Sequence, residues 1–167
     1  MRITNKGEYG LRIAMRLARH YENGYPMTTH EIAHIEHLPE EFVQKLLWEL
    51  LRAGLIESRR GAKGGFVLAK PPRDITARQI VWTLEGGVFE VACVRFMEGE
   101  KRCMYLDLHD CGLRALWVNI YKKVNELLTE ANLELLIQEE DRVKERLATV
   151  AGRQVIPITP HISATGT

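Results

Sequence analysis

Residues 38–69, LPEEFVQKLLWELLRAGLIESRRGAKGGFVLA, contain the change of periodicity on which the expected fold depends. Apolar residues first recur at helical spacing, and Gly54 closes this segment. Pro39 suits the first turn of such a helix. Residues 55–58 and 66–69 then have the composition of two short strands joined by a basic, glycine-rich turn. This stretch therefore predicts a helix followed by a β-hairpin.

Two further helices are predicted before this stretch. Residues 4–21 carry apolar side chains near i, i+4 spacing, which indicates an amphipathic helix. A short helix follows over residues 29–36, and we expect Ile32, Ala33 and Ile35 to face inward. Three helices, the last two joined by a tight turn, and then a hairpin form a winged helix-turn-helix. In that design the third helix enters the major groove of DNA.

The second half of the chain is predicted to be helical. Thr76 can cap a fourth helix, Cys111 opens a long amphipathic helix, and a last helix covers residues 133–149. The long helix carries an apolar stripe, made of Leu113, Leu116, Trp117, Ile120, Val124, Leu127 and Leu128. A small domain cannot cover so wide a stripe alone, so we expect a homodimer. The expected fold is mainly α with a small β-hairpin wing: a winged helix-turn-helix plus a long dimerisation helix.

Charge is divided unevenly along the chain. Residues 1–80 hold 13 Lys and Arg against 9 Asp and Glu, whereas residues 81–167 hold 10 against 13. The front half is therefore basic (+4) and the back half acidic (−3), although the whole chain is close to neutral. This suggests that only the front half meets a polyanion. Together with the predicted elements, it gives a DNA-binding domain over 1–80, a cysteine loop with dimerisation helices over 81–150, and a mobile tail over 151–167.

Composition excludes several classes of protein. The chain has 167 residues, of which 46% are hydrophobic and 27% charged, so wholesale disorder and a fibrous repeat are excluded. No apolar run is long enough to cross a bilayer, and the first residues lack the apolar core of a signal peptide. We expect a cytoplasmic protein that does not contact membranes.

Residues 30–34, His-Glu-Ile-Ala-His, match the H-E-x-x-H pattern of zinc proteases. In a protease the two histidines bind the metal and the glutamate acts as the base. Here the stretch falls on the short second helix, whose apolar residues are needed for packing, and neither a third ligand nor a cleft is visible. We therefore expect no enzyme.

The predicted wing is basic. It carries Arg59, Arg60, Lys63, Lys70 and Arg73, against the single acidic side chain of Glu57. Such cations can neutralise phosphates and release counterions, which supplies most of the affinity of a DNA-binding protein. The alternative is a solubilising hairpin that binds nothing.

Several blocks of the sequence resemble the Rrf2 family of bacterial transcription regulators. They are MRITNKGEYGLR at 1–12, LRAGLI at 51–56, RGAKGGFVLA at 60–69 and DIT at 74–76. They agree in order and spacing, and the resemblance covers about residues 1–130. It implies a dimeric protein that binds double-stranded DNA, with the long helix at the dimer interface.

The resemblance also implies a set of DNA-facing residues. On the third helix these are Pro39, Glu41, Gln44 and Lys45, and the wing arginine is Arg60. Gln44 can read adenine through two hydrogen bonds, and Lys45 can bind guanine or a phosphate. For Gln44, the alternative is an ordinary solvated helix residue.

Three cysteines follow the fourth helix. Cys93, Cys103 and Cys111 are spaced C-x9-C-x7-C in a stretch without clear periodicity. Thiolates in such a loop can converge on one iron–sulfur cluster, and the helix that begins after Cys111 favours a negative charge there. The alternative is a set of three ordinary thiols.

The resemblance favours the cluster, because its cluster-binding members carry three cysteines in this loop. It implies an iron–sulfur cluster, 2Fe–2S or 4Fe–4S, that senses redox state, nitric oxide or iron–sulfur status. Glu8 matches the position of an acidic fourth ligand in some members, and His109 and Asp110 are adjacent candidates. The alternative function is a cluster-free repressor controlled by a protein partner or a small metabolite.

Overall fold

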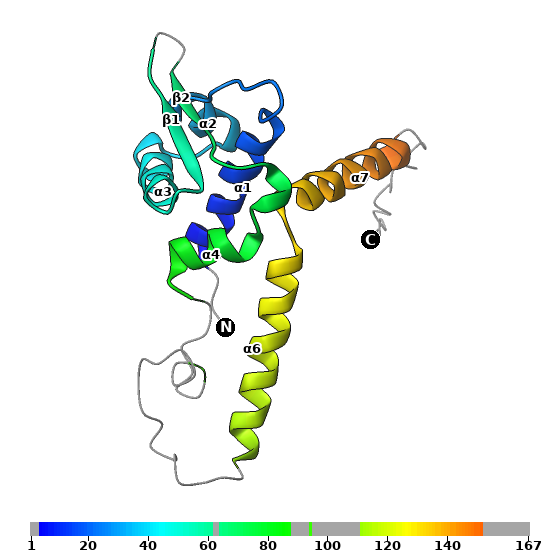
Figure 1. The fold of residues 1–167 in the computed structure, drawn as a ribbon. Coiled ribbons are helices and arrows are strands. Elements are labelled where there is room, and N and C mark those ends of the chain that lie inside the picture. Colours follow the sequence, from blue (N-terminus) through cyan, green and yellow to red (C-terminus); the bar gives the residue numbers. More distant parts are fainter. Residues whose placement is uncertain (1–3, 62–63, 88–93, 95–110, 152–167) are drawn as a thin grey trace, which may run out of the picture. The chain divides into compact units, whose positions relative to one another are not determined.

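The computed structural model describes residues 4–61, 64–87, 94 and 111–151, and the predicted tail from 152 onward lies outside them (Figure 1). The chain forms two units, residues 1–137 and residues 138–167. Its elements are α1 (Asn5–Arg19), α2 (Thr29–Glu36), α3 (Glu40–Arg52), β1 (Ile56–Arg59), β2 (Gly65–Leu68), a 3-10 turn (Pro72–Asp74), α4 (Ala77–Glu85), α6 (Gly112–Glu130) and α7 (Leu133–Ala151). This order confirms the prediction of a mainly helical winged helix-turn-helix with a small hairpin.

Two helices begin at the hydroxyl residues that the sequence places before them. At α2, the Thr28 N–H donates to the Glu31 carboxylate (2.7 Å), and the Glu31 N–H donates to the Thr28 hydroxyl (3.1 Å). The Thr28 N–H and hydroxyl lower the pKa of Glu31 below its ordinary value. Thr76 and Gln79 form the same reciprocal pair at α4. These capping boxes satisfy backbone donors that the first helical turn leaves free.

The first three helices bury their apolar faces against one another, but one predicted core position is wrong. Ile32 and Ala33 are buried as expected, whereas Ile35 is exposed. The inward position belongs instead to Glu36, whose side chain is only 4% exposed and forms ion pairs with Arg12 and Arg16 of α1. A buried carboxylate requires such partners, and α1 supplies them.

The turn between α2 and α3 is tight. His37 caps α2 in the left-handed conformation, with φ of 55°. The next N–H, that of Leu38, donates to the Ala33 carbonyl (3.0 Å). Pro39 lies one position earlier than predicted: it is the N-cap of α3 with extended backbone, and Glu40 is the first helical residue. This turn sets the direction in which α3 leaves α2.

The hairpin has a third backbone partner that the sequence did not reveal. β1 and β2 pair antiparallel, with Ile56 opposite Leu68. Met27, between α1 and α2, exchanges two hydrogen bonds with Phe66 of β2 (2.8 and 3.0 Å). A Cβ at Gly65 would lie 2.5 Å from the Met27 carbonyl oxygen, so only glycine permits this close approach.

Helix α4 packs directly on α1. A Cβ at Gly10 of α1 would lie 1.9 Å from Leu84 Cδ1, so the contact depends on a glycine at this position. Next to it, the Glu85 carboxylate accepts hydrogen bonds from the Thr4 hydroxyl (2.7 Å), the Gly7 N–H (2.8 Å) and the Thr4 N–H (3.1 Å). Glu85 therefore caps the first turn of α1 from the end of α4.

The remaining helices complete the described chain. The Leu133 N–H donates to the Ile75 carbonyl (3.0 Å), which joins the start of α7 to the segment before α4. Beyond Gln138, exposed ion pairs such as Lys144–Glu140 (2.7 Å) lie along α7. None of the described helices has the length and apolar character needed to span a membrane.

The Glu85 cap predicts a pH-dependent contribution to stability. Burial raises the pKa of Glu85, but the hydrogen bonds from Thr4 and Gly7, with the charge of Lys6, outweigh it and hold the pKa below its ordinary value of 4.5. The stabilisation is therefore complete above that value and is lost as the pH falls through the lower, folded-state pKa. We expect Glu85→Gln to lower the free energy of unfolding by about 1–2 kcal/mol at pH 7.

Urea unfolding of both proteins at pH 7 and pH 3.5 checks this. The difference between wild type and Glu85→Gln should shrink at pH 3.5, because this pH lies below the ordinary pKa of 4.5 and the unfolded state then binds a proton that the folded carboxylate resists. An equal difference at both pH values would contradict the assigned role.

Candidate nucleic-acid interface

Helix α3 has one buried face and one exposed face. Val43, Leu46, Leu47 and Leu50 are fully buried and anchor the helix in the core. Besides Glu40, which pairs with His30, the exposed side chains of α3 are Glu41, Gln44, Lys45, Trp48 and Arg52, and each lies three or four residues from at least one other. Residues at this spacing share one side of a helix. We call these five residues the exposed face of α3.

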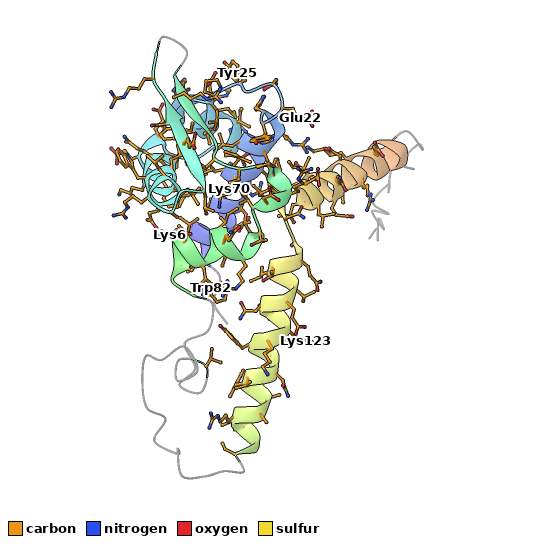
Figure 2. All side chains as sticks on the ribbon, in the orientation of Figure 1. Lys6, Glu22, Tyr25, Lys70, Trp82 and Lys123 are labelled. Atoms are coloured by element: carbon orange, nitrogen blue, oxygen red, sulfur yellow. The ribbon has the colours of Figure 1, made fainter. Side chains whose placement is uncertain are left out.

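An ion pair holds α3 against the start of α1. Lys6 Nζ lies 2.7 Å from the Glu49 carboxylate (Figure 2). Because Glu49 forms an ion pair with Lys6, its negative charge is not part of the exposed face of α3. Three of the four predicted groove residues, Glu41, Gln44 and Lys45, therefore lie together on a surface that the core keeps turned outward.

The H-E-x-x-H residues lie beside this surface. His30 Nδ1 lies 2.6 Å from the Glu40 carboxylate at the first turn of α3. A hollow of about 390 Å³ opens here, and His34, His37 and Pro39 also line it. Within the described ranges, no three His, Cys, Asp or Glu side chains are grouped so that they could hold a metal ion.

The hairpin distinguishes its two arginines. Arg59 Nη1 donates to the Gly24 carbonyl (2.8 Å), so this side chain fastens the wing to the loop before α2. Arg60 is exposed, and no hydrogen bond or ion pair engages it within the described part of the chain. Of the two, Arg60 has the guanidinium available for a phosphate, while Lys63 lies outside the described residues.

The predicted cluster ligands are only partly described. Cys111 is the N-cap of α6, and its free thiol is half-buried. Glu8 lies on α1 with a 58% exposed side chain, 3.5 Å from Arg12. Cys93 and Cys103, with the alternative ligands His109 and Asp110, lie outside the described residues.

Sequence reasoning missed Trp48 and Arg52. Both continue the spacing of Gln44 by four and eight residues, and that continuation is the signal that could have found them. Its apolar character suggests that Trp48 belongs to the buried face. In the structure, however, its side chain points outward, although its neighbours Leu47 and Glu49 are buried and half-buried. It is 55% exposed.

Comparison with known proteins decides the family. The family model described as "Rrf2: Iron-dependent Transcriptional regulator" matches residues 3–139. The chain belongs to the Rrf2 family. The transcriptional regulator CymR of Bacillus subtilis is 36% identical over 145 residues, which cover 87% of this chain and 96% of CymR.

Solved structures agree with this assignment. CymR, described as the global cysteine regulator of B. subtilis, matches with a TM-score of 0.68 at 34% identity, covering 83% of this chain and 98% of that one. IscR of T. potens matches with a TM-score of 0.64 at 27% identity, covering 86% and 90%. This Rrf2 protein is thus a transcriptional regulator with a winged-helix fold and not an enzyme. Residues 30–34 lie within α2, the second helix of the helix-turn-helix.

The two arginines of the wing should respond differently to mutation. We expect Arg60→Ala to weaken DNA binding by about ten-fold without changing stability, because it removes one charge-assisted contact to the duplex. Arg59→Ala should lower the free energy of unfolding by about 1 kcal/mol, because the Gly24 carbonyl loses its donor. Fluorescence anisotropy with a labelled duplex and urea unfolding measure the two effects, and a DNA affinity unchanged in Arg60→Ala would remove the wing from the interface.

Proposed function

We propose that this Rrf2 protein is a dimeric regulator that binds palindromic DNA through α3 and the wing, and that senses redox state, nitric oxide or iron–sulfur status through a cysteine-ligated cluster. The observation that carries the DNA-binding part is the exposed face of α3. Its five residues are one acidic, one amide, two basic and one aromatic side chain, on a helix whose opposite face is fully buried. A helix so anchored can present its outer face to the major groove without unfolding.

Each residue at the front of α3 has a defined part in this proposal. Gln44 offers both an acceptor and a donor, the pair that adenine requires, and Lys45 suits guanine or a phosphate. Glu41 lies one turn earlier, where a carboxylate can accept from the amino group of cytosine. Pro39 begins the helix at the groove, and Arg60, with Lys63 and Arg59, contributes positive charge from the wing.

The experiment that tests DNA binding is selection from a random duplex library with the wild-type protein. We expect the enriched sequences to contain an inverted repeat whose half-sites are about one turn of DNA apart, as two-fold protein symmetry requires. Lys45→Ala should bind the enriched duplex more weakly, with a salt dependence reduced by about one unit if it contacts a phosphate. An enriched sequence without symmetry would contradict the dimeric arrangement.

Helix α6 supports the dimer because its apolar stripe is only partly covered within the chain. Trp117, Ile120, Tyr121 and Val124 pack near Val81 of α4, and the rings of Tyr121 and Trp82 lie 6.5 Å apart (Figure 2). A second set remains exposed: Leu113 (60%), Leu116 (52%) and Leu127 (65%). Covering these leucines with the same helix of a second copy would remove a large apolar surface from water.

This division also determines which mutation tests the dimer. Ile120→Glu would disturb the packing against α4 as well, because Ile120 packs near Val81. Leu116 is 52% exposed in the single chain, so Leu116→Glu leaves the packing against α4 in place. We expect it to yield folded monomers, because an unpaired carboxylate would be buried at the seam.

Analytical ultracentrifugation measures the oligomeric state, and circular dichroism confirms the fold. Ala115→Glu is the matched control, because it adds the same carboxylate at the neighbouring exposed position, which points to another side of α6. The control should remain dimeric. Dimers of Leu116→Glu at the wild-type dissociation constant would contradict the proposed interface.

The donor set fits an iron–sulfur cluster. Three thiols and one carboxylate are ligands that such clusters accept, and we propose Cys93, Cys103 and Cys111 with Glu8. Cys111 supports this part by its place: it is the N-cap of the 19-residue helix α6, and its free thiol is half-buried. When bound, the cluster supplies a one-electron redox centre that also reacts with nitric oxide.

Glu8 would connect the ligand set to the DNA-binding domain. It lies on α1, the helix whose Lys6 holds Glu49 of α3 and whose first turn Glu85 caps. Its carboxylate is exposed, with only the salt bridge to Arg12 at 3.5 Å. An exposed carboxylate in a weak surface pair can exchange partners at little cost.

Anaerobic purification followed by iron and sulfide analysis and a visible spectrum tests the cluster. We expect a brown wild-type protein, and a colourless or unstable one for each of Cys93→Ala, Cys103→Ala and Cys111→Ala. Glu8→Ala should keep the cluster but change its spectrum. A silent Glu8→Ala would transfer the role to His109 or Asp110.

The second candidate is a cluster-free repressor controlled by a protein partner or a small metabolite. The similarity to CymR, described as a global cysteine regulator, favours it. Iron and sulfide analysis separates the two functions. If the wild-type protein holds neither iron nor sulfide after anaerobic reconstitution and still binds DNA, the cluster-free repressor is the function that remains.

A further inference from the structure

Trp48 has no explanation in the folding of this chain. It is 55% exposed in the middle of α3. No ring contact or hydrogen bond engages its indole within the described residues. Burying an indole is worth far more than burying most side chains, so a large aromatic left in water on a stable helix is a candidate contact residue.

The neighbours of Trp48 indicate the chemistry of what covers it. On its own side of α3 lie Gln44 and Lys45 one turn before and Arg52 one turn after, all exposed. Among the residues of α3, all of which are described, Trp48 is the only exposed large apolar side chain. A protein–protein seam would need several apolar neighbours, as the exposed leucines of α6 provide. A single aromatic between an amide and two cations suits a polyanion with apolar patches.

Its place along the helix selects a part of the DNA. Trp48 lies seven residues after Glu41, which is about 10 Å along an α-helix. The major groove is about 12 Å wide, and a recognition helix presents its N-terminal residues to the bases. Trp48 therefore comes at the wall of the groove, where deoxyribose offers C–H groups and the phosphate offers acceptors.

Building on the proposed DNA binding, we infer that Trp48 is a contact to the sugar–phosphate backbone. The flat face of the indole packs on deoxyribose, and its N–H donates to a phosphate oxygen. Such a contact positions α3 in the groove without reading sequence. It is also neutral, so it displaces no counterion, in contrast to Lys45 and Arg52.

Anisotropy titrations over a range of KCl concentrations test this, with the enriched duplex and a scrambled duplex of equal composition. We expect Trp48→Ala to bind both duplexes about ten-fold more weakly, with the salt dependence of wild type, and Trp48→Phe to lose only part of this. Lys45→Ala, by contrast, should reduce the salt dependence by about one unit. The matched control is Leu135→Ala, which removes an exposed apolar side chain from α7 and should bind as wild type does.

Acrylamide quenching supplies a readout that does not depend on affinity. We expect DNA to shield the portion of wild-type fluorescence that Trp48→Phe lacks. The backbone contact is overturned if Trp48→Ala binds DNA with wild-type affinity, or if it loses affinity for the enriched duplex alone. It is also overturned if Trp48→Ala changes the sedimentation coefficient while its DNA affinity stays unchanged. If wild type binds neither duplex, or if Lys45→Ala and Arg60→Ala bind as wild type does, the proposed function itself fails instead.

Discussion

The contact between α1 and α4 supports the rest of this structure. Gly10 lets Leu84 reach the backbone of α1, and Glu85 then caps the first turn of that helix with three hydrogen bonds. Helix α1 in turn holds its neighbours through charge: Lys6 pairs with Glu49 of α3, and Arg16 with Glu36 of α2. The orientation of α2 and α3 thus depends on α1, and α4, which lies outside the helix-turn-helix, fixes the position of α1.

This arrangement separates the groups that build the domain from those left for a ligand. Glu36, Glu49 and Arg59 are engaged within the chain, although their types alone would suggest surface charges. Gln44, Lys45 and Arg60 remain exposed near α3 and the wing. Because Lys6 pairs with Glu49, the exposed surface of α3 is less negative than the composition of that helix suggests.

The long helix α6 likewise has residues that build the fold and residues that remain exposed. Part of its apolar stripe packs near Val81 and Trp82 of α4, and the leucines of the same stripe remain exposed. Helix α4 contacts both α6 and α1. The surface proposed for dimerisation, on α6, and the surface proposed for DNA, on α3, therefore both depend on the position of α4.

Local patterns in the sequence determined most of the fold. Thr28 with Glu31 and Thr76 with Gln79 fix helix starts through contacts three residues apart, and such contacts form in any fold that keeps the helix. The hairpin also follows from periodicity, whereas Glu41, Gln44 and Lys45, which are exposed in the structure, were implied by the family resemblance. The family resemblance, carried by ordered blocks, was confirmed by the match over residues 3–139.

Only the tertiary structure decided which charged and aromatic side chains serve the fold. Ile35 and Glu36 are adjacent, and hydrophobicity favours burying the isoleucine, yet the arginines of α1 draw the glutamate inward. Arg59 and Arg60 are equivalent in sequence, but Gly24, 35 residues from Arg59, accepts from that one alone. Partners so distant along the chain leave no periodic signal, because their approach is set by the packing of whole helices.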